Sequence, residues 1–349
     1  MRVPLSRRAA LAGLVGVSCR RGGPPSGAAG GRAEEGGPAK SATSATSEAS
    51  ATARAAASAP PAASGESAPS GAAGGAPRVL DWSFPGAAAQ GGAERAIAIV
   101  PAPAAGEAAR RYPVLIALHG RGEAVRGPEA GAYGWVRDYH LLKHLEALGR
   151  GVLRPEDFQS FVATERLAAF NEALRARPYE GLIVVCPHTP DVLRPPAPFE
   201  AAAPFGRWLV ETLVPKVLAE CPAEASAVGI DGVSLGGRVA LLAGLSAPST
   251  FRSVGTLQPA FQAAEAEALA VRAKAYLAAR PEGKLRLLTS EGDPFREAVG
   301  AIHQAWQAAG LRHEHRVALG PHNYDFNRGP GGLEMLLWHD RVLRGLEPL

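Results

Sequence analysis

The stretch AVGIDGVSLGG, residues 227–237, decides the fold. Its first five residues are typical of a short buried strand, and residues 236–245 have the period of a helix. Between them, Gly232-Val233-Ser234-Leu235-Gly236 matches the pattern G-x-S-x-G, in which a serine lies on a tight turn from strand to helix. Small residues two positions before and after the serine let the strand and the helix approach each other. The pattern predicts that the hydroxyl of Ser234 stands clear at the edge of a sheet as a nucleophile.

On both sides of this stretch, short apolar runs alternate with longer segments of helical period. We expect strands at 96–100, 114–119, 182–186, 227–231, 253–257, 285–289 and 314–319. We expect helices at 206–220, 236–245, 263–279, 295–309 and 332–343. Strands without polar alternation are buried on both faces, as in a parallel sheet covered by helices. Residues 78–349 are therefore predicted to form one α/β domain, with a mostly parallel central sheet and helices on both faces.

One connection is longer than a simple crossover requires. Between Gly120 and Gly181, segments 137–148 and 156–175 have helical character on either side of a Gly-rich break. We interpret residues 135–178 as a helical insertion between two strands. The second helix is expected near the top of the sheet, either as a lid or as an extension of the surface layer.

A serine nucleophile needs a base, and the base needs an acid that orients it. The G-x-S-x-G pattern goes with the chain order serine, acid, histidine. Asp293 follows the predicted strand 285–289, and His322 follows the strand 314–319, so both lie at carboxyl ends of strands, where ligands bind in open α/β sheets. We predict His322 as the base and Asp293 as the acid, with Glu291 as the alternative acid.

Two backbone N–H groups are expected to stabilise the oxyanion. Leu235 directly follows the nucleophile, and the turn His119-Gly120-Arg121-Gly122-Glu123 follows the strand 114–119. We name Arg121 as the second donor, with Gly122 as the alternative. His188 and Trp135 are predicted to line the substrate pocket, with Tyr133 and Phe261 as further walls.

The amino terminus is typical of an export signal. Arg7 and Arg8 precede a weakly apolar run in the manner of a twin-arginine signal, and Cys19 resembles a lipoprotein cleavage site. Residues 1–19 are therefore predicted to be a signal peptide, with lipidation at Cys19 and a periplasmic or outer-envelope location. In residues 20–77, the run 23–77 consists of Ala, Gly, Ser or Pro at 45 of 55 positions, which predicts a disordered linker.

Charge and cysteine content exclude several classes of protein. The net charge is +4, but eight of the 37 basic and four of the 33 acidic residues lie in 1–77, which leaves 29 of each in the remainder. A neutral folded part argues against nucleic-acid binding. The sequence has no apolar run of 18 residues, which excludes a multi-pass membrane protein. Three cysteines exclude a disulfide scaffold, and we expect Cys186 and Cys221 to be buried and unpaired.

These features resemble the putative esterase group of the α/β-hydrolases, the broad family of esterase D, feruloyl esterases and polyhydroxybutyrate depolymerases. The residues that carry the resemblance are 113–122 (PVLIALHGRG), 208–215, 232–237 (GVSLGG), 251–257, Asp293 and His322. The resemblance implies the α/β-hydrolase fold and hydrolysis of carboxylic esters through an acyl-enzyme, without metal or organic cofactor. The insertion and the histidine loop, Pro-His-Asn-Tyr, depart from the family pattern.

Other functions share these residues. The same triad serves serine peptidases and acyltransferases, and the sequence does not separate them from an esterase. A third interpretation is a non-catalytic, tethered binding lipoprotein on a hydrolase scaffold. The expected partner of an esterase is a small or polymeric ester.

Overall fold

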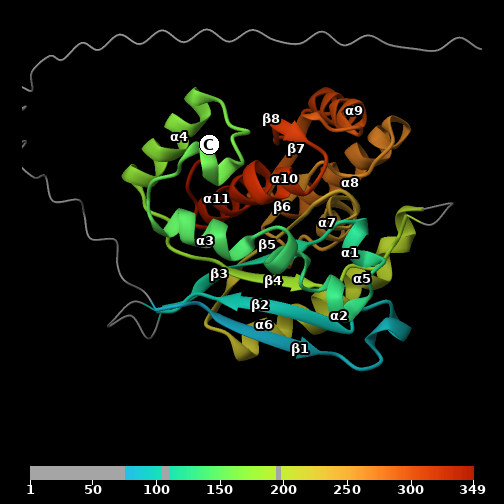
Figure 1. The fold of residues 1–349 in the computed structure, drawn as a ribbon. Coiled ribbons are helices and arrows are strands. Elements are labelled where there is room, and N and C mark those ends of the chain that lie inside the picture. Colours follow the sequence, from blue (N-terminus) through green and yellow to red (C-terminus); the bar gives the residue numbers. More distant parts are fainter. Residues whose placement is uncertain (1–74, 104–109, 194–197) are drawn as a thin grey trace, which may run out of the picture. The chain divides into compact units, whose positions relative to one another are not determined.

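The computed structural model describes residues 75–103, 110–193 and 198–349 (Figure 1). The predicted signal peptide, Cys19 and all but the last three residues of the predicted linker lie outside these residues, so export and lipidation stay predictions. The described chain forms an eight-stranded sheet in the order β1-β2-β4-β3-β5-β6-β7-β8. The strands are β1 (Arg78–Ser83), β2 (Arg95–Val100), β3 (Tyr112–Leu118), β4 (Ile183–Pro187), β5 (Ala223–Gly232), β6 (Ser253–Leu257), β7 (Lys284–Gly292) and β8 (Glu314–Pro321).

The sheet is parallel from β4 to β8, whereas β1 and β2 pair antiparallel with each other and β2 pairs antiparallel with β4. All seven expected strands are present, which confirms the predicted mostly parallel sheet. The first strand, RVLDWS at 78–83, was not predicted. It is an edge strand with several exposed residues, so it lacks the apolar run that marks the buried strands.

Helices cover both faces of the sheet (Figure 1). Alternate residues of β3 belong to two separate cores: Val114, Ile116 and Leu118 pack with helices α5 to α9, and Leu115 and Ala117 pack with α3, α4 and α11. The α-helices are α1 (Arg121–Ala124), α2 (Pro128–Gly131), α3 (Leu141–Gly149), α4 (Thr164–Ala176), α5 (Ala203–Trp208), α6 (Val214–Glu220), α7 (Leu235–Ser246), α8 (Ala266–Ala279), α9 (Arg296–Ala308), α10 (Tyr324–Phe326) and α11 (Gly332–Leu343). Short 3₁₀ and π turns are η1 (Ala87–Gln90), η2 (Gly134–Asp138), η3 (Pro155–Phe158), η4 (Phe199–Ala202), η5 (Leu209–Leu213), η6 (Ala263–Glu265) and η7 (Asn327–Gly331).

The second helix of the insertion begins later than the sequence suggests. Gln159 and Ser160 have φ angles of 52° and 62°, which end the short turn η3 and leave α4 to begin at Thr164. The guanidinium of Arg166 donates two hydrogen bonds, of 2.9 and 2.6 Å, to the carboxylate of Glu334 on α11. Because this ion pair is largely buried, it holds α4 against α11 in the outer layer of the sheet.

Cys186 and Cys221 are both buried and free. Burial raises the pKa of the Cys186 thiol far above its usual range, which makes this cysteine a small apolar residue of the core. Within the described ranges, no helix combines the length and the apolar character that crossing a membrane requires.

Candidate active site

The serine of the G-x-S-x-G pattern lies between β5 and α7 with a strained backbone. Ser234 has φ 56° and ψ −114°, a conformation that non-glycine residues rarely adopt. A Cβ atom placed on Gly232 would lie 2.5 Å from the backbone of Gly236, and one placed on Gly236 would lie 2.5 Å from the carbonyl oxygen of His119. The two glycines are therefore required by the close approach of strand, helix and the turn after β3.

Ser234, His322 and Asp293 form one hydrogen-bonded chain. The Oγ atom of Ser234 lies 3.1 Å from Nε2 of His322, and Nδ1 of His322 lies 2.8 Å from Oδ1 of Asp293. Because an ionised carboxylate only accepts hydrogen bonds, Nδ1 carries the imidazole proton and Nε2 is free to accept from the serine. Three segments that are 59 and 29 residues apart in the chain thus meet at the carboxyl edge of the sheet.

The carboxylate of Asp293 is fixed by two further donors. Its Oδ1 accepts from the backbone N–H of Phe295 at 3.0 Å, and its Oδ2 accepts from the hydroxyl of Thr289 at 2.5 Å. The neighbouring Glu291 is exposed, and the hydrogen bond to His322 comes from Asp293. The arrangement favours Asp293 over Glu291 as the orienting acid.

A cavity of about 270 Å³ opens beside Ser234. It is lined by residues of the turn after β3, of the histidine loop and of the sheet edge, namely Gly120, Arg121, Gly122, Glu123, Tyr139, Val233, Ser234, Gln258, His322, Asn323, Tyr324 and Asn327. Residues 150–178 do not line it, so the second helix of the insertion does not border the cavity in this structure. The insertion contributes only Tyr139.

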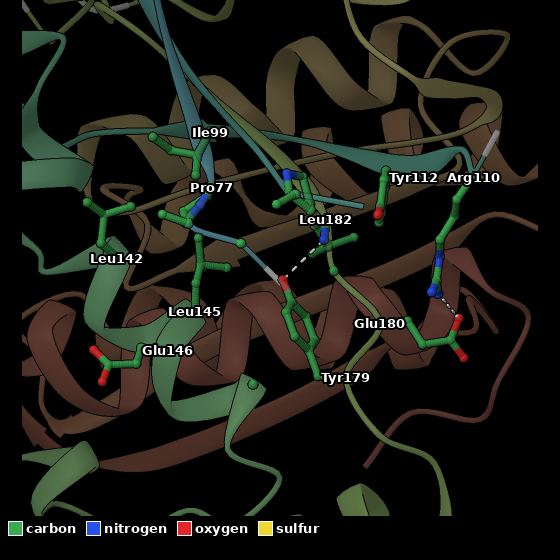
Figure 2. Close-up of a pocket in the computed structure, with 16 residues that line it drawn as sticks. Pro77, Ile99, Arg110, Tyr112, Leu142, Leu145, Glu146, Tyr179, Glu180 and Leu182 are labelled. Carbon is green, nitrogen blue, oxygen red and sulfur yellow. Dashed lines mark hydrogen bonds and ion pairs between the residues drawn. The ribbon is translucent and has the colours of Figure 1, made fainter. Parts of the chain in front are cut away.

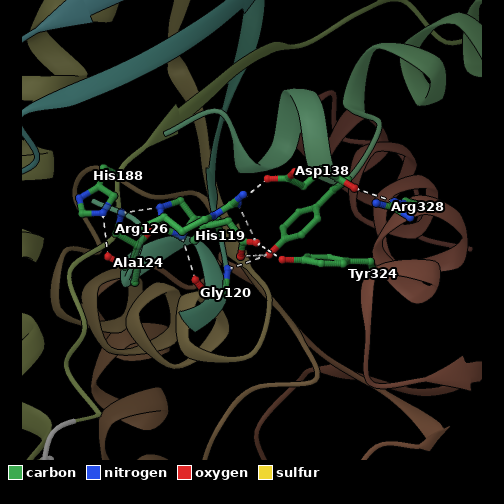
Figure 3. A network of polar contacts seen from close by, with 11 residues as sticks. His119, Gly120, Ala124, Arg126, Asp138, His188, Tyr324 and Arg328 are labelled. Carbon is green, nitrogen blue, oxygen red and sulfur yellow. Dashed lines mark hydrogen bonds and ion pairs between the residues drawn. The ribbon is translucent and has the colours of Figure 1, made fainter. Parts of the chain in front are cut away.

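The residues predicted as pocket walls do not line this cavity. Trp135 is fully buried and packs edge-on against Tyr139, which itself lines the cavity. His188 bonds to the carbonyl oxygen of Ala124 at 3.2 Å and lies beside His119 (Figure 3). Tyr133 bonds to Asp81 on β1, and Phe261 lies in the core with α7. These side chains make packing contacts within the protein. A single sequence does not show whether an aromatic residue packs in the core or contacts a ligand.

His119 fixes the turn that follows β3. Its Nε2 accepts from the backbone N–H of Thr189 at 2.9 Å, so its Nδ1 carries the proton and donates to the carbonyl oxygen of Gly120 at 2.9 Å. Complete burial lowers the pKa of His119 to about 3. The imidazole is therefore neutral and ties the turn to the loop after β4.

Buried neutral histidines make the fold sensitive to acid. Burial also lowers the pKa of His144 to about 4, and its Nε2 lies 3.1 Å from the carbonyl oxygen of Asn327. In the unfolded chain both histidines bind a proton near pH 6.5, so the unfolded state gains protons as the pH falls below this value. Their contribution to stability is complete above pH 6.5 and is lost progressively toward the folded pKa values.

We expect these two histidines to lower the free energy of unfolding by about 3 kcal/mol per pH unit between pH 6 and pH 4.5, at about 1.4 kcal/mol each. Urea unfolding at several pH values measures the slope. His144→Gln, whose amide can still donate to Asn327, should reduce it by about 1.4 kcal/mol per pH unit, since other histidines with a lowered pKa, such as His315, keep their share. A slope that the variant leaves unchanged would contradict the assignment of this acid sensitivity to His144.

A second Ser-His-Asp arrangement lies behind the strand that leads to Ser234. Ser253 Oγ is 2.8 Å from Nδ1 of His339, whose Nε2 is 3.0 Å from Oδ2 of Asp231. All three residues are fully buried, and Oδ2 of Asp231 also accepts from Arg286 at 2.9 Å. Oδ1 of Asp231 accepts from the N–H of Gly232 at 2.7 Å. No substrate reaches this serine, so the network is structural. It supports the turn of Ser234 through the hydrogen bond between Asp231 and Gly232.

The two predicted oxyanion donors both begin helices. Leu235 is the first residue of α7, and Arg121 is the first residue of α1. N–H groups at the first positions of a helix have no partner within that helix, which leaves them available to a ligand. Gly122 follows Arg121 at the cavity wall and stays the alternative. The side chain of Arg121 pairs with Asp191 at 3.1 Å.

Several residues at the cavity had no predicted role, among them Glu123, Tyr139, Gln258 and Tyr324. Gln258 has φ 47°, and its Nε2 donates to the carbonyl oxygen of Pro321 at 3.0 Å, next to His322. Tyr324 follows His322 by two residues, so its place in the histidine loop was the one available signal. Glu123 lies in the turn quoted for the oxyanion donors, whereas nothing local marks Tyr139 and Gln258.

A larger cavity of about 590 Å³ lies at the opposite edge of the sheet (Figure 2). Tyr112 begins β3 and Leu182 precedes β4, so this cavity is at the amino ends of the parallel strands. It contains no triad residue, and we place the chemistry at the smaller cavity. Within residues 75–103, 110–193 and 198–349, no group of three or more His, Cys, Asp or Glu side chains could hold a metal ion.

Comparison with known proteins agrees with this geometry. Residues 190–323, which include Ser234, Asp293 and His322, match the family model described as "Putative esterase". A solved ferulic acid esterase is 15% identical with a TM-score of 0.52, over 76% of this chain and 99% of that one. The fluorophosphonate-binding serine hydrolase FphF of Staphylococcus aureus is 12% identical with a TM-score of 0.50, over 76% of this chain and 99% of that one. No curated protein sequence matches this chain.

The described chain has the α/β-hydrolase fold. At these identities the solved structures establish the shared fold, which confirms the expected fold class. The match to the family model covers residues 190–323, which is less than half of the chain.

Proposed function

We propose that the protein hydrolyses carboxylic esters through an acyl-enzyme on Ser234. The observation that carries the proposal is the relay of 3.1 and 2.8 Å from Ser234 through His322 to Asp293, on a strained turn that faces a cavity. Hydroxyl and imidazole are at hydrogen-bonding distance, as nucleophilic catalysis requires. The esterase-family match supports the ester as the substrate class.

In the first half of the reaction, Oγ of Ser234 attacks the ester carbonyl carbon while Nε2 of His322 takes the hydroxyl proton. Asp293 holds the imidazole in the required tautomer and stabilises the imidazolium that forms. The carbonyl oxygen becomes an oxyanion, which the N–H groups of Leu235 and Arg121 stabilise. The tetrahedral intermediate collapses, His322 returns the proton to the leaving alcohol, and the acyl group stays on Ser234.

In the second half, a water molecule takes the place of the alcohol. His322 removes a proton from the water as its oxygen attacks the acyl carbon, and the second tetrahedral intermediate releases the acid. The proton then returns to Oγ of Ser234. The site ends in its starting state, and one ester and one water give one acid and one alcohol.

The size of the cavity favours small substrates. About 270 Å³ is below the range of roughly 300–1,000 Å³ in which drug-sized ligands bind. We therefore expect p-nitrophenyl acetate and butyrate to be hydrolysed faster than the octanoate. A panel that also contains methyl ferulate, peptide p-nitroanilides and a sugar as acyl acceptor separates the esterase from the peptidase and the acyltransferase.

Labelling with a fluorophosphonate tests the nucleophile independently of the substrate. We expect one covalent adduct per chain, located at Ser234 by peptide mass spectrometry. A purified protein that is folded, hydrolyses none of the esters and takes up no label would overturn the proposal in favour of a tethered binding protein. Faster cleavage of the anilides than of the esters would overturn it in favour of a peptidase.

A further inference from the structure

Glu123 is a buried carboxylate at the wall of the active-site cavity. It lies two residues after Arg121, and only 1% of its surface is exposed. Three side chains donate to it, and Figure 3 labels two of them, Arg126 and Tyr324. The hydroxyl of Tyr139 donates to Oε2, the hydroxyl of Tyr324 donates to Oε1 at 2.8 Å, and Arg126 donates to Oε1 at 3.1 Å.

These contacts join the two loops that form opposite sides of the reaction centre. The hydroxyl of Tyr139 accepts from the backbone N–H of Gly120 at 3.1 Å, in the turn that leads to the predicted oxyanion donors. Tyr324 lies in the loop of His322, two residues further along. One carboxylate thus connects the turn after β3 to the histidine loop, across 201 residues of sequence.

Both phenols are donors at any working pH. Burial, followed by the charge of Glu123, raises the pKa of Tyr139 well above its usual value. Burial and the hydrogen bond to Glu123 raise the pKa of Tyr324. Since the two hydroxyls keep their protons near neutral pH, both remain donors to Glu123.

Direct stabilisation of the reaction does not explain a carboxylate at this place. A negative charge close to a forming oxyanion opposes the reaction, because like charges repel strongly where water is excluded. Arg126 offsets only part of this charge, since it also pairs with Asp138. The position of Glu123 is therefore best explained by the hydrogen bonds that it accepts.

We propose that Glu123 is a positioning residue, which holds the oxyanion turn and the histidine loop in the reactive geometry through Tyr139 and Tyr324. The inference rests on the proposed function. Interactions with the oxyanion exist only in the transition state, so a loosened turn lowers kcat and leaves KM nearly unchanged. If Glu123 had a merely structural role, its loss would lower stability without lowering kcat selectively over KM.

The test compares Tyr139→Phe, Tyr324→Phe and Glu123→Gln with a matched control, Tyr276→Phe. Tyr276 is also buried, and its hydroxyl donates to the carbonyl oxygen of Phe251 at 2.8 Å, far from the site on α8. We expect kcat for p-nitrophenyl acetate to fall about 10- to 100-fold in Tyr139→Phe and Glu123→Gln, because small displacements of catalytic donors have effects of this size. KM should change by less than about threefold. The control should lose a similar amount of thermal stability and keep kcat within about twofold.

Inhibition by phenylboronic acid gives a second readout, because its tetrahedral adduct on serine resembles the transition state. Its Ki should rise in proportion to the loss of kcat/KM. In the Glu123→Gln background, Tyr139→Phe should have a much smaller effect than in the wild type, since both act through the same carboxylate.

The inference is overturned if kcat and Ki are unchanged in both Tyr324→Phe and Glu123→Gln, in protein whose Ser234 still reacts with fluorophosphonate. Equal losses of kcat in Tyr139→Phe and in Tyr276→Phe would also overturn it, because the effect would then follow stability alone. Failure of the proposed function is distinct from both, since it shows as a wild-type protein that neither turns over esters nor takes up the label.

Discussion

Ser234→Ala is expected to lose kcat for p-nitrophenyl acetate by about 10⁴- to 10⁶-fold, because the variant has no oxygen that can form the acyl-enzyme. His322 and Asp293 would stay in place, 2.8 Å apart, but without a nucleophile to activate. The side chain of Ser234 donates no structural hydrogen bond beyond the triad, so thermal stability should be nearly unchanged. Initial rates and a thermal melt on the same sample measure both quantities.

Ser246→Ala is the matched control for this variant. Ser246 is the last residue of α7, the helix that begins next to Ser234, and its hydroxyl donates to the carbonyl oxygen of Leu242 at 2.7 Å. It should keep wild-type kcat. If Ser234→Ala kept more than about a hundredth of the wild-type rate, Ser234 would be removed from the role of nucleophile.

The second large effect is expected on kcat when Asp293, which bonds to His322, is replaced, and Asp231, which bonds to His339, serves as the comparison. Asp293→Asn should lower kcat by about 10⁴-fold, because an amide in this place favours the wrong tautomer of His322. Asp231→Asn should act mainly on stability. It leaves the buried guanidinium of Arg286 without its carboxylate, and breaking a buried pair in this way costs about 3–5 kcal/mol.

Thermal unfolding and active-site titration separate the two outcomes. We expect Asp231→Asn to lower Tm by roughly 5–15 °C and to keep kcat of the folded fraction within about tenfold of wild type. Glu291→Gln, at the exposed neighbour of Asp293, should keep both properties. The assignment of the acid is wrong if Glu291→Gln loses kcat as Asp293→Asn does, and the structural role of Asp231 is wrong if its variant is as stable as wild type.

The network of Asp231 also shows why residue type alone does not identify a catalytic site. A Cβ atom on Gly255 would lie 2.0 Å from Oδ2 of Asp231, so the network exists only where glycine leaves room for it. Two Ser-His-Asp chains occur in one domain, and exposure at a cavity distinguishes them. Burial of a given side chain depends on what packs over it, which is a property of the whole fold.

The sequence by itself determined the alternation of strands and helices, the G-x-S-x-G turn and the order of Ser234, Asp293 and His322. These features are local: an apolar run predicts a buried strand, and a glycine two positions from a serine reports a close approach of backbone. The carboxyl ends of neighbouring parallel strands meet at one edge, so the meeting of the three side chains followed from topology.

Only the tertiary structure decided which side chains surround the triad. Trp135 and His188 have the residue types of a pocket wall, yet packing placed Trp135 beneath the site and turned His188 toward Ala124. Glu123 and Tyr324 became neighbours across 201 residues, and Arg166 bonds to Glu334 across 168. Contacts of this kind depend on how the layers of the fold pack, because shape and charge in three dimensions determine which side chains meet. They produce no pattern in the residues that neighbour them in the sequence.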